Sequence, residues 1–347
     1  MKLRKFSGIL AATIILTACN GESKTEEKSE DNKASRADLA LHKEATSFFQ
    51  TLPESKPFGS AITQLGKKLY YENALSVNGK LSCNSCHLLD NFGVDNEPTS
   101  PGHNDIRGER NSPTVYNAYF HIAQFWDGRA ADLKEQAAGP VLNPVEMGMP
   151  DSNAAVSSIK KIKDYVKYFK IAFPEEENPV TYDNITEAIG EFEKTLATPA
   201  PFDDYLEGDL TALNDNQKKG LSLFIEKGCI TCHMGGGLGG SMYQKFGLVK
   251  GPYWEYTGSE LQDKGRESFT GNEADRYFFK VPTLRNVAET APYFHDGSVE
   301  DLGEAIKIMS VTQLGKELTN EEVNSIKAFL KSLTGEIPEH ALLAENS

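Results

Sequence analysis

Cysteine is scarce in this chain, with five residues in 347, and long apolar segments are scarce as well. Beyond the first 18 residues, no stretch is long and apolar enough to cross a membrane. Acidic residues outnumber basic ones, and the formal net charge is −14. This charge argues against nucleic acid as a partner and permits a basic protein partner. A role in solubility explains it equally well. The length suffices for two domains of ordinary size, each with its own core.

The first 18 residues predict an export signal. Three basic residues precede an apolar run over residues 8–16 that is too short to span a bilayer. The Leu-Thr-Ala-Cys sequence that ends at Cys19 resembles the lipobox of bacterial lipoproteins. We therefore expect acylated Cys19 to anchor the protein to a bacterial membrane, with the body in the periplasm. The alternative is ordinary cleavage that leaves Cys19 as a plain residue.

Composition also suggests how the rest of the chain is divided. Residues 19–38 are charged and small, which predicts a flexible tether, and the body is expected to begin near Leu39. The stretch 198–217 is rich in Pro, Asp and Gly and is the best domain boundary. This boundary gives an N-terminal domain over residues 39–200 and a C-terminal domain over residues 201–347.

The four remaining cysteines form two pairs, each followed at once by histidine: CNSCH at residues 83–87 and CITCH at residues 229–233. A zinc ribbon would place two such pairs about 15–20 residues apart, whereas 143 positions separate Cys86 from Cys229. A thioredoxin-like thiol pair would need alternating strands and helices around it. Covalent attachment of two heme c groups accounts for all cysteines and histidines of the two motifs. One heme is held by Cys83 and Cys86, and the other by Cys229 and Cys232. Their irons are bound by His87 and His233.

The surroundings of the two motifs are similar to each other. In each case a helix with apolar periodicity and then a turn precede the motif, over residues 66–87 and 220–233. Helical periodicity recurs over residues 154–169, 185–196 and 320–333, and no run of alternating strands is evident. We therefore expect a mostly α fold in which two cytochrome c-like heme domains pack against each other.

The second axial ligand of each iron decides whether the site only transfers electrons or also binds a substrate. The residue types alone do not choose among the candidates, which are His42, His103, His121, His295, His340, Met147, Met149, Met234, Met242 and Met309. Met309 lies on an apolar helical face that suits core packing, and a core role is the ordinary one for Trp126. His295 is expected to be structural near the second heme, and His121 to be a loop or surface residue.

Two long segments, residues 101–148 and 279–315, resemble the bacterial di-heme cytochrome c peroxidase family. The motifs that carry the resemblance are NSPTVYNA, QFWDGR, GPVLNPVEM, VPTLRN and YFHDGS, together with both CxxCH motifs. The resemblance implies a cytochrome-c peroxidase that reduces hydrogen peroxide to water. Its electrons would come from a small cytochrome c or cupredoxin, and members of the family are commonly homodimers.

For the N-terminal half, the resemblance implies a low-potential heme on His87 at which peroxide is reduced. His103 matches the displaceable distal ligand of this iron, and Gln136 and Glu146 match the peroxide pocket. Cleavage of the O–O bond requires a proton to move from the near oxygen to the leaving one, and a carboxylate such as Glu146 can carry it. A neutral amide such as Gln136 can orient peroxide without competing for that proton.

For the C-terminal half, the resemblance implies a high-potential heme held by His233 and Met309, with Trp126 between the two hemes. Thioether ligation raises the potential of a heme, which suits an electron store. The resemblance also implies one calcium ion between the domains, and hard oxygen donors suit that ion. Its ligands would be the Asn111 side chain and the backbone carbonyls of Thr290 and Pro292.

Two alternatives stay open at this point. A related di-heme oxidase, like the enzymes that mature methylamine dehydrogenase, would act on a protein or organic substrate, but these carry tyrosine where this chain has Met309. A pure electron-transfer cytochrome would keep both irons six-coordinate and would leave the GPVLNPVEM pocket unexplained. The sequence does not identify the electron donor, nor whether the N-terminal heme must be activated by reduction.

Overall fold

The structure is a computed structural model that describes residues 35–342. The predicted export signal, the lipidation site Cys19 and residues 19–34 of the predicted tether lie outside the described residues. The first helix, α1 (Arg36–Phe48), begins three residues before Leu39, inside the stretch expected to be tether. A capping box starts it: the Asp38 amide donates to the Ser35 hydroxyl over 3.0 Å, and the Ser35 amide donates to the Asp38 carboxylate over 3.3 Å.

Helices dominate the described residues, as the sequence periodicity predicts. They are α1, α2 (Ala61–Tyr70), α3 (Leu133–Leu142), α4 (Ser152–Lys160), α5 (Lys163–Ala172), α6 (Tyr182–Glu193), α7 (Pro201–Glu207), α8 (Asp215–Lys227), α9 (Trp254–Thr257), α10 (Glu267–Thr270), α11 (Leu302–Leu314) and α12 (Asn320–Lys331), with short 3₁₀ turns between them. Strands β1 (Tyr243–Lys245) and β2 (Phe278–Lys280) pair antiparallel, with Tyr243 opposite Lys280. None of the helices between residues 35 and 342 has the length and apolar character needed to cross a membrane.

Two separate apolar cores hold the body together. The first lies between α2, α3, α5 and α6 and includes Leu65, Leu69 and Phe192. The second lies around α8, α11 and α12 and includes Phe224 and Phe329. Each fully buried leucine or phenylalanine contributes about 1.5–3 kcal/mol through burial. Each core lies beside one CxxCH motif, so the predicted mostly α fold with one motif in each half is confirmed.

The same helix crossing occurs once in each half. Helix α2 crosses α6 at Gly66, where an added Cβ would lie 1.8 Å from the carbonyl oxygen of Ala188. Helix α8 crosses α12 at Gly220, where an added Cβ would lie 1.9 Å from the carbonyl oxygen of Ser325. Backbones this close leave no room for any side chain, so glycine is required at both crossings. The helix that precedes each motif is therefore fixed in the same way.

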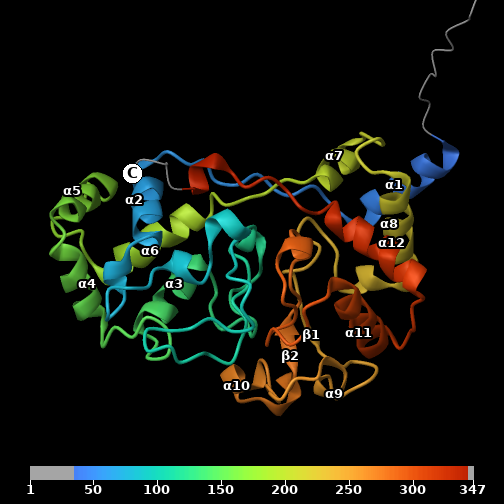
Figure 1. Cartoon of the computed structure of the whole chain (residues 1–347). Helices are drawn as coiled ribbons and strands as arrows, with labels where there is room; N and C mark the ends of the chain where they lie inside the picture. The colour runs from blue at the N-terminus through green and yellow to red at the C-terminus, as the bar shows by residue number, and fades with distance from the viewer. Residues whose placement is uncertain (1–34, 343–347) are drawn as a thin grey trace, which may run out of the picture. The chain divides into compact units, whose positions relative to one another are not determined.

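The two ends of the described chain cross over between the halves (Figure 1). Ala45 and Phe49 of the α1 region pack into the second core, although they precede the first core in sequence. Ala341 is fully buried in the first core, and its carbonyl oxygen accepts a hydrogen bond from the Tyr71 hydroxyl over 3.0 Å. The chain passes from one core to the other near residue 200. The expected limits of 39–200 and 201–347 therefore do not describe the two ends, because α1 and residues 337–342 each join the opposite core.

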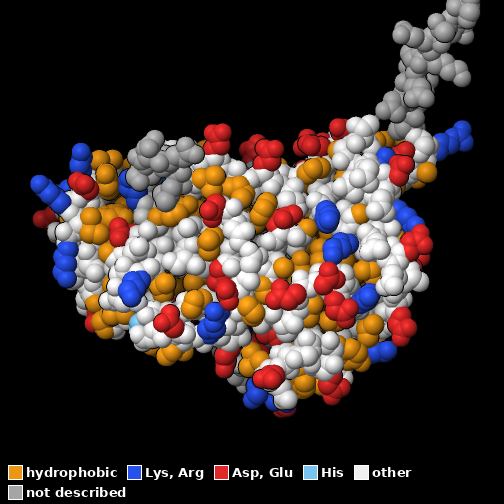
Figure 2. Space-filling model, in the orientation of Figure 1, with side chains coloured by type: hydrophobic (Ala, Val, Ile, Leu, Met, Phe, Trp, Pro, Cys, Tyr) orange, Lys and Arg blue, Asp and Glu red, His pale blue; other side chains and the backbone are white. Residues whose placement is uncertain are grey.

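Acidic side chains are spread over the face of the molecule drawn in Figure 2 and are interspersed with lysine and arginine. They do not gather in one patch on that face. This distribution fits the solubility explanation of the net charge of −14.

Candidate functional site

The two CxxCH motifs have the same backbone geometry. Each forms a single 3₁₀ turn, Cys83–Ser85 in one half and Cys229–Thr231 in the other. The histidine amide then donates to the carbonyl oxygen of the first cysteine over 3.0 Å in both cases. All four thiols are free rather than joined in disulfides. Each turn thus presents two thiols and one imidazole, the set that covalent heme attachment uses.

Burial favours the neutral, iron-binding form of both motif histidines. Burial lowers the pKa of His233 to about 4 and also lowers the pKa of His87. The Nδ1 atom of His233 lies 3.0 Å from the carbonyl oxygen of Leu238, which orients the ring. A neutral imidazole with one nitrogen engaged by the backbone and the other free is the usual heme ligand.

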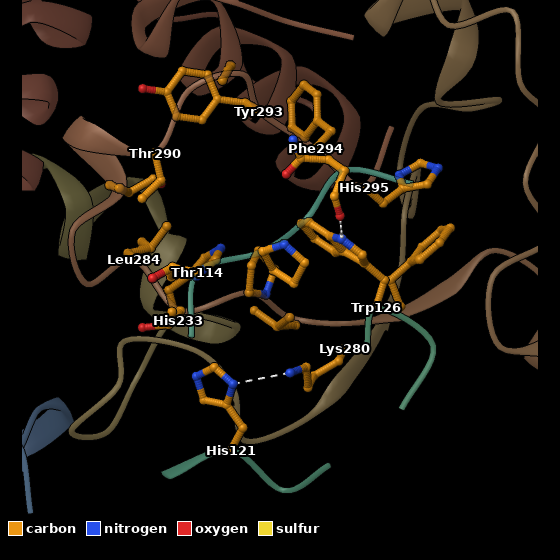
Figure 3. Close-up of a pocket in the computed structure, with 18 of the residues that line it drawn as sticks. Thr114, His121, Trp126, His233, Lys280, Leu284, Thr290, Tyr293, Phe294 and His295 are labelled. Atoms are coloured by element: carbon orange, nitrogen blue, oxygen red, sulfur yellow. Dashed lines mark hydrogen bonds between the residues drawn. The ribbon is translucent and has the colours of Figure 1, made fainter. Parts of the chain in front are cut away.

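One large cavity collects most of the predicted site residues from both halves, and Figure 3 shows part of its lining. It is lined by His87, Asn111, Trp126, Gln136, Glu146, Cys229, Cys232, His233, Thr290, Pro292 and Met309, among others. Cys83, Cys86 and His103 are not in the lining. Met309 projects from α11, is half-buried against the second core, and lines the same cavity as His233. The free thiols, the neutral histidines and this cavity fit two heme c groups.

The predicted peroxide residues come from α3 and the turn that follows it. Asp132 caps α3 by accepting the Glu135 amide over 2.9 Å, which fixes the helix that carries Gln136. Glu146 lies in the turn after the helix, where the Asn143 side-chain amide donates to its Oε1 over 2.8 Å. Burial raises the pKa of Glu146, although Arg129 and the Asn143 hydrogen bond act in the opposite direction. A carboxyl group with a raised pKa in a cavity is a candidate for proton transfer.

His103 lies against the turn formed by residues 143–148. Its Nε2 is 2.9 Å from the carbonyl oxygen of Pro144, and its backbone amide donates to the carbonyl oxygen of Glu146 over 2.8 Å. An added Cβ at Gly148 would lie 2.4 Å from the same Nε2. The imidazole is thus held beside the peroxide residues and outside the cavity lining, and its role as an iron ligand stays a prediction.

Trp126 is fixed at the junction of the two halves. Its Nε1 donates to the carbonyl oxygen of Asn111 over 2.9 Å, and the Asn111 amide donates to the carbonyl oxygen of His295 over 2.7 Å. The Trp126 and His295 rings pack edge to face with their centres 6.3 Å apart. Figure 3 shows both rings at the cavity. His295 is buried among aromatic rings, and a structural role near the second heme stays a prediction.

The oxygen atoms implied for calcium lie around the same junction. The Asn111 side-chain amide donates to the carbonyl oxygen of Glu97 over 3.0 Å, which turns its Oδ1 away from that carbonyl. Within residues 35–342, Asn111 Oδ1 and the carbonyl oxygens of Thr290 and Pro292 accept no hydrogen bond. All three residues line the cavity. Hard oxygens of this type are the donors that calcium takes in proteins, and the calcium site stays a prediction.

Sequence reasoning missed an internal repeat around Trp126. The segments PTVYNAYFHIAQFWDG and PTLRNVAETAPYFHDG, residues 113–128 and 282–297, place Trp126 and His295 at matching positions. Asn117 and Asn286 both adopt a left-handed backbone, with φ of 64° and 60°, and both side chains donate to the Thr198 hydroxyl over 2.9 Å. The identical residues at matching positions of the two segments could have revealed this repeat.

Other cavity residues had no motif to identify them. Lys280 and Glu193 are buried residues with ionisable side chains, and both line the cavity. His121, expected to be a loop or surface residue, lines it as well, and its Nε2 is buried. A buried polar group is a property of the fold, so single-residue patterns could not show it.

Comparison with known proteins decides the family. The family model described as "Di-haem cytochrome c peroxidase" matches residues 60–211, and the one described as "Cytochrome c" matches residues 217–334. Cytochrome c551 peroxidase of Pseudomonas aeruginosa is 48% identical over 306 residues, which covers 86% of this chain and 88% of that protein. The chain belongs to the di-heme cytochrome c peroxidase family.

Two further relatives of this family agree. Cytochrome c551 peroxidase of Nitrosomonas europaea is 47% identical, over 84% of this chain and 86% of that protein. A crystal structure of a MauG-like protein associated with microbial copper homeostasis is 28% identical, with a TM-score of 0.72 over 84% of this chain and 95% of that one. The resemblance seen in the sequence, the cytochrome-c peroxidase class and the two heme c groups are confirmed.

Proposed function

We propose that this di-heme cytochrome c peroxidase reduces hydrogen peroxide to water with electrons from a small cytochrome c or cupredoxin. The observation that carries the proposal is that Glu146 and Gln136 line the same cavity as His87. When bound, the two hemes supply electron storage and the iron at which the O–O bond is cleaved. The residues of the chain supply ligands, orientation and protons.

Glu146 is proposed to move the proton. Asn143 holds its Oε1, so the other carboxylate oxygen is available to the cavity. Burial raises the pKa of this group, which brings its protonation closer to neutral pH than that of an exposed glutamate. The Gln136 amide offers both a donor and an acceptor, so it can orient peroxide without changing its charge.

The C-terminal half is proposed to receive the electrons and pass them to the N-terminal half. His233 and Met309 line the cavity within the same half, and a histidine–methionine pair gives a high-potential heme. Trp126 lies at the junction, fixed by its hydrogen bond to Asn111. This position supports a role for the indole between the two hemes.

His103 is proposed to gate the peroxide site. The position it occupies, with Nε2 at the carbonyl oxygen of Pro144, offers the imidazole a binding place away from the cavity. We expect His103→Ala to turn over peroxide in the fully oxidised state, because no imidazole would have to leave the iron first. Peroxide consumption is measured on oxidised and on pre-reduced protein, and wild type is the control. If the variant still needs pre-reduction, His103 is not the gate.

Calcium is proposed to bind Asn111, Thr290 and Pro292. We expect a chelator to lower the thermal midpoint of wild type, because an ion that binds only the folded state stabilises it by about 2.7 kcal/mol at a concentration of 100 times Kd. Asn111→Ala should lose most of this response, whereas Asn104→Ala, an exposed asparagine, should keep it. Equal chelator responses in both variants would remove Asn111 from the site.

The decisive test of the proposed function is peroxide turnover by protein with one heme reduced, together with its optical spectra. We expect turnover and a high-spin heme. A pure electron-transfer cytochrome would show neither in any redox state. Turnover of a protein or organic substrate in place of peroxide would favour the related oxidases, although methionine at position 309 supports the peroxidase.

Export to the periplasm and attachment through lipidated Cys19 are proposed from the sequence alone. Mass spectrometry of the mature N-terminus tests both at once, because an acylated cysteine and simple cleavage differ in mass. A homodimer remains a prediction from the family resemblance.

A further inference from the structure

A buried lysine without a carboxylate partner lines the cavity. Lys280, at the end of β2, is 8% exposed. The nearby carboxylate of Asp127 is already engaged by Arg110 at 2.6 Å and Arg129 at 3.1 Å. Within residues 35–342, Lys280 forms no ion pair. Burial lowers the pKa of Lys280 to about 8, and an unpaired buried ammonium is costly enough that a partner is to be expected.

The hydrogen bond made by Lys280 also fixes the state of His121. The Lys280 Nζ lies 3.1 Å from His121 Nδ1 (Figure 3). An ammonium can only donate, so Nδ1 accepts and the ring proton is on Nε2. That Nε2 is buried and has no hydrogen-bond partner in the described part of the chain. The ring packs closely on the Gly240 backbone, where an added Cβ would lie 2.3 Å from its Cδ2.

The pair therefore presents two sets of unsatisfied donors at the cavity: the remaining N–H groups of Lys280 and the Nε2–H of His121. The group that satisfies them must be an acceptor, and it must carry negative charge to compensate the ammonium. A carboxylate meets both conditions. Each heme c brings two carboxylates, its propionates.

The position of the pair indicates which heme provides the carboxylate. On the neighbouring strand β1, Gln244 is paired with Phe279, and Gln244 lines the cavity together with Cys232. Residues 281–284, which follow Lys280 directly, line the cavity together with His233. We propose that Lys280 and His121 together bind a propionate of the C-terminal heme.

This assignment gives the propionate a structural role. His121 belongs to the N-terminal half, and its neighbour Ile122 contacts the C-terminal half, because the Ile122 amide donates to the Gly240 carbonyl oxygen over 2.9 Å. Lys280 belongs to the C-terminal half. One carboxylate thus contacts both halves and connects the C-terminal heme to the segment that leads to Trp126.

The test is the pH dependence of the heme midpoint potentials, measured by spectroelectrochemistry on the holoprotein from about pH 6 to about pH 8. With its cation in place the propionate stays ionised, so the C-terminal potential of wild type should be flat over this range. In Lys280→Met the propionate should take up a proton on reduction. We expect its potential to fall with rising pH by an amount equal to about a tenfold change in the reduction equilibrium, 59 mV for one electron.

Matched variants distinguish the loss of the Lys280 cation from a general disturbance of the structure. Lys280→Arg keeps a cation and should stay flat, as should Lys250→Met, which removes an exposed lysine. His121→Leu removes the second donor without removing the charge, and should alter the propionate bending bands in resonance Raman spectra. Asp127 stays paired with both arginines in every variant. Flat potentials in Lys280→Met and unchanged bands in His121→Leu would overturn the proposal, and a shift confined to the N-terminal heme would overturn its assignment to the C-terminal one.

Discussion

Glu146→Gln should lower peroxide turnover by about 10²–10⁴-fold, the range expected when a positioned acid–base group is removed. The amide preserves the shape of the side chain and can still accept the hydrogen bond that Asn143 donates to Oε1. It cannot take up or release a proton at neutral pH. The fold and the heme content should therefore be unchanged while the chemical step is lost.

The pH profile gives this prediction a second readout. Since burial raises the pKa of Glu146, wild-type activity that depends on its carboxylate should decline as pH falls through that raised pKa. The residual activity of Glu146→Gln should not show this decline at falling pH. Glu135→Gln, an exposed glutamate on α3, is the matched control and should retain turnover. Retention of turnover within about twofold in Glu146→Gln would exclude it as the proton carrier, because loss of a general acid–base group has a far larger effect.

Asp203→Ala should destabilise the protein by about 3–5 kcal/mol, the usual result of removing one partner of a buried ion pair. Arg285 is completely buried, and both of its terminal nitrogens donate to the Asp203 carboxylate, one of them over 2.7 Å. The same carboxylate accepts the Leu52 amide over 2.7 Å and the Ala200 amide over 2.8 Å. In this variant the Arg285 guanidinium would remain charged in the interior of the second core, without its carboxylate partner.

The measurement is chemical unfolding of the holoprotein at several pH values. Burial opposes the charge on Asp203, but Arg285 and the two amides outweigh it, so the pKa of Asp203 is lowered on folding. A lowered pKa contributes stability that is complete above the unfolded value of about 3.9 and is lost as pH falls toward the folded value. The stability difference between wild type and Asp203→Ala should shrink on acidification. Asp204→Ala, an exposed neighbour on α7, should unfold like wild type at every pH.

The sequence predicted those parts of the molecule that depend on local patterns. The CxxCH motifs identified both attachment sites because the two thiols and the imidazole must lie within one turn. Helical periodicity gave the fold class. The family motifs brought Glu146, Gln136, Trp126 and Met309 into the candidate site, and the structure places all four at one cavity.

Features that depend on packing between distant segments were not predictable in this way. The unsatisfied donors of Lys280 and His121 arise where two halves meet, 159 positions apart in sequence. The position of His103 depends on the turn at residues 143–148, whose carbonyl groups cannot be placed from residue types. The crossing of the chain ends had no signal at all, because Ala45, Phe49 and Ala341 are ordinary apolar residues whose partners lie in the other half.

That crossing has a consequence for biosynthesis. The α1 segment is made first, yet the apolar surface that it covers comes from residues 202–333, so Ala45 and Phe49 stay uncovered until most of the chain exists. Conversely, the first core lacks Ala341 until that residue has been made. The first half therefore cannot complete its core before the second half has been made, although domains ordinarily fold in order from the N-terminus. Both halves should reach their final stability at nearly the same stage of synthesis.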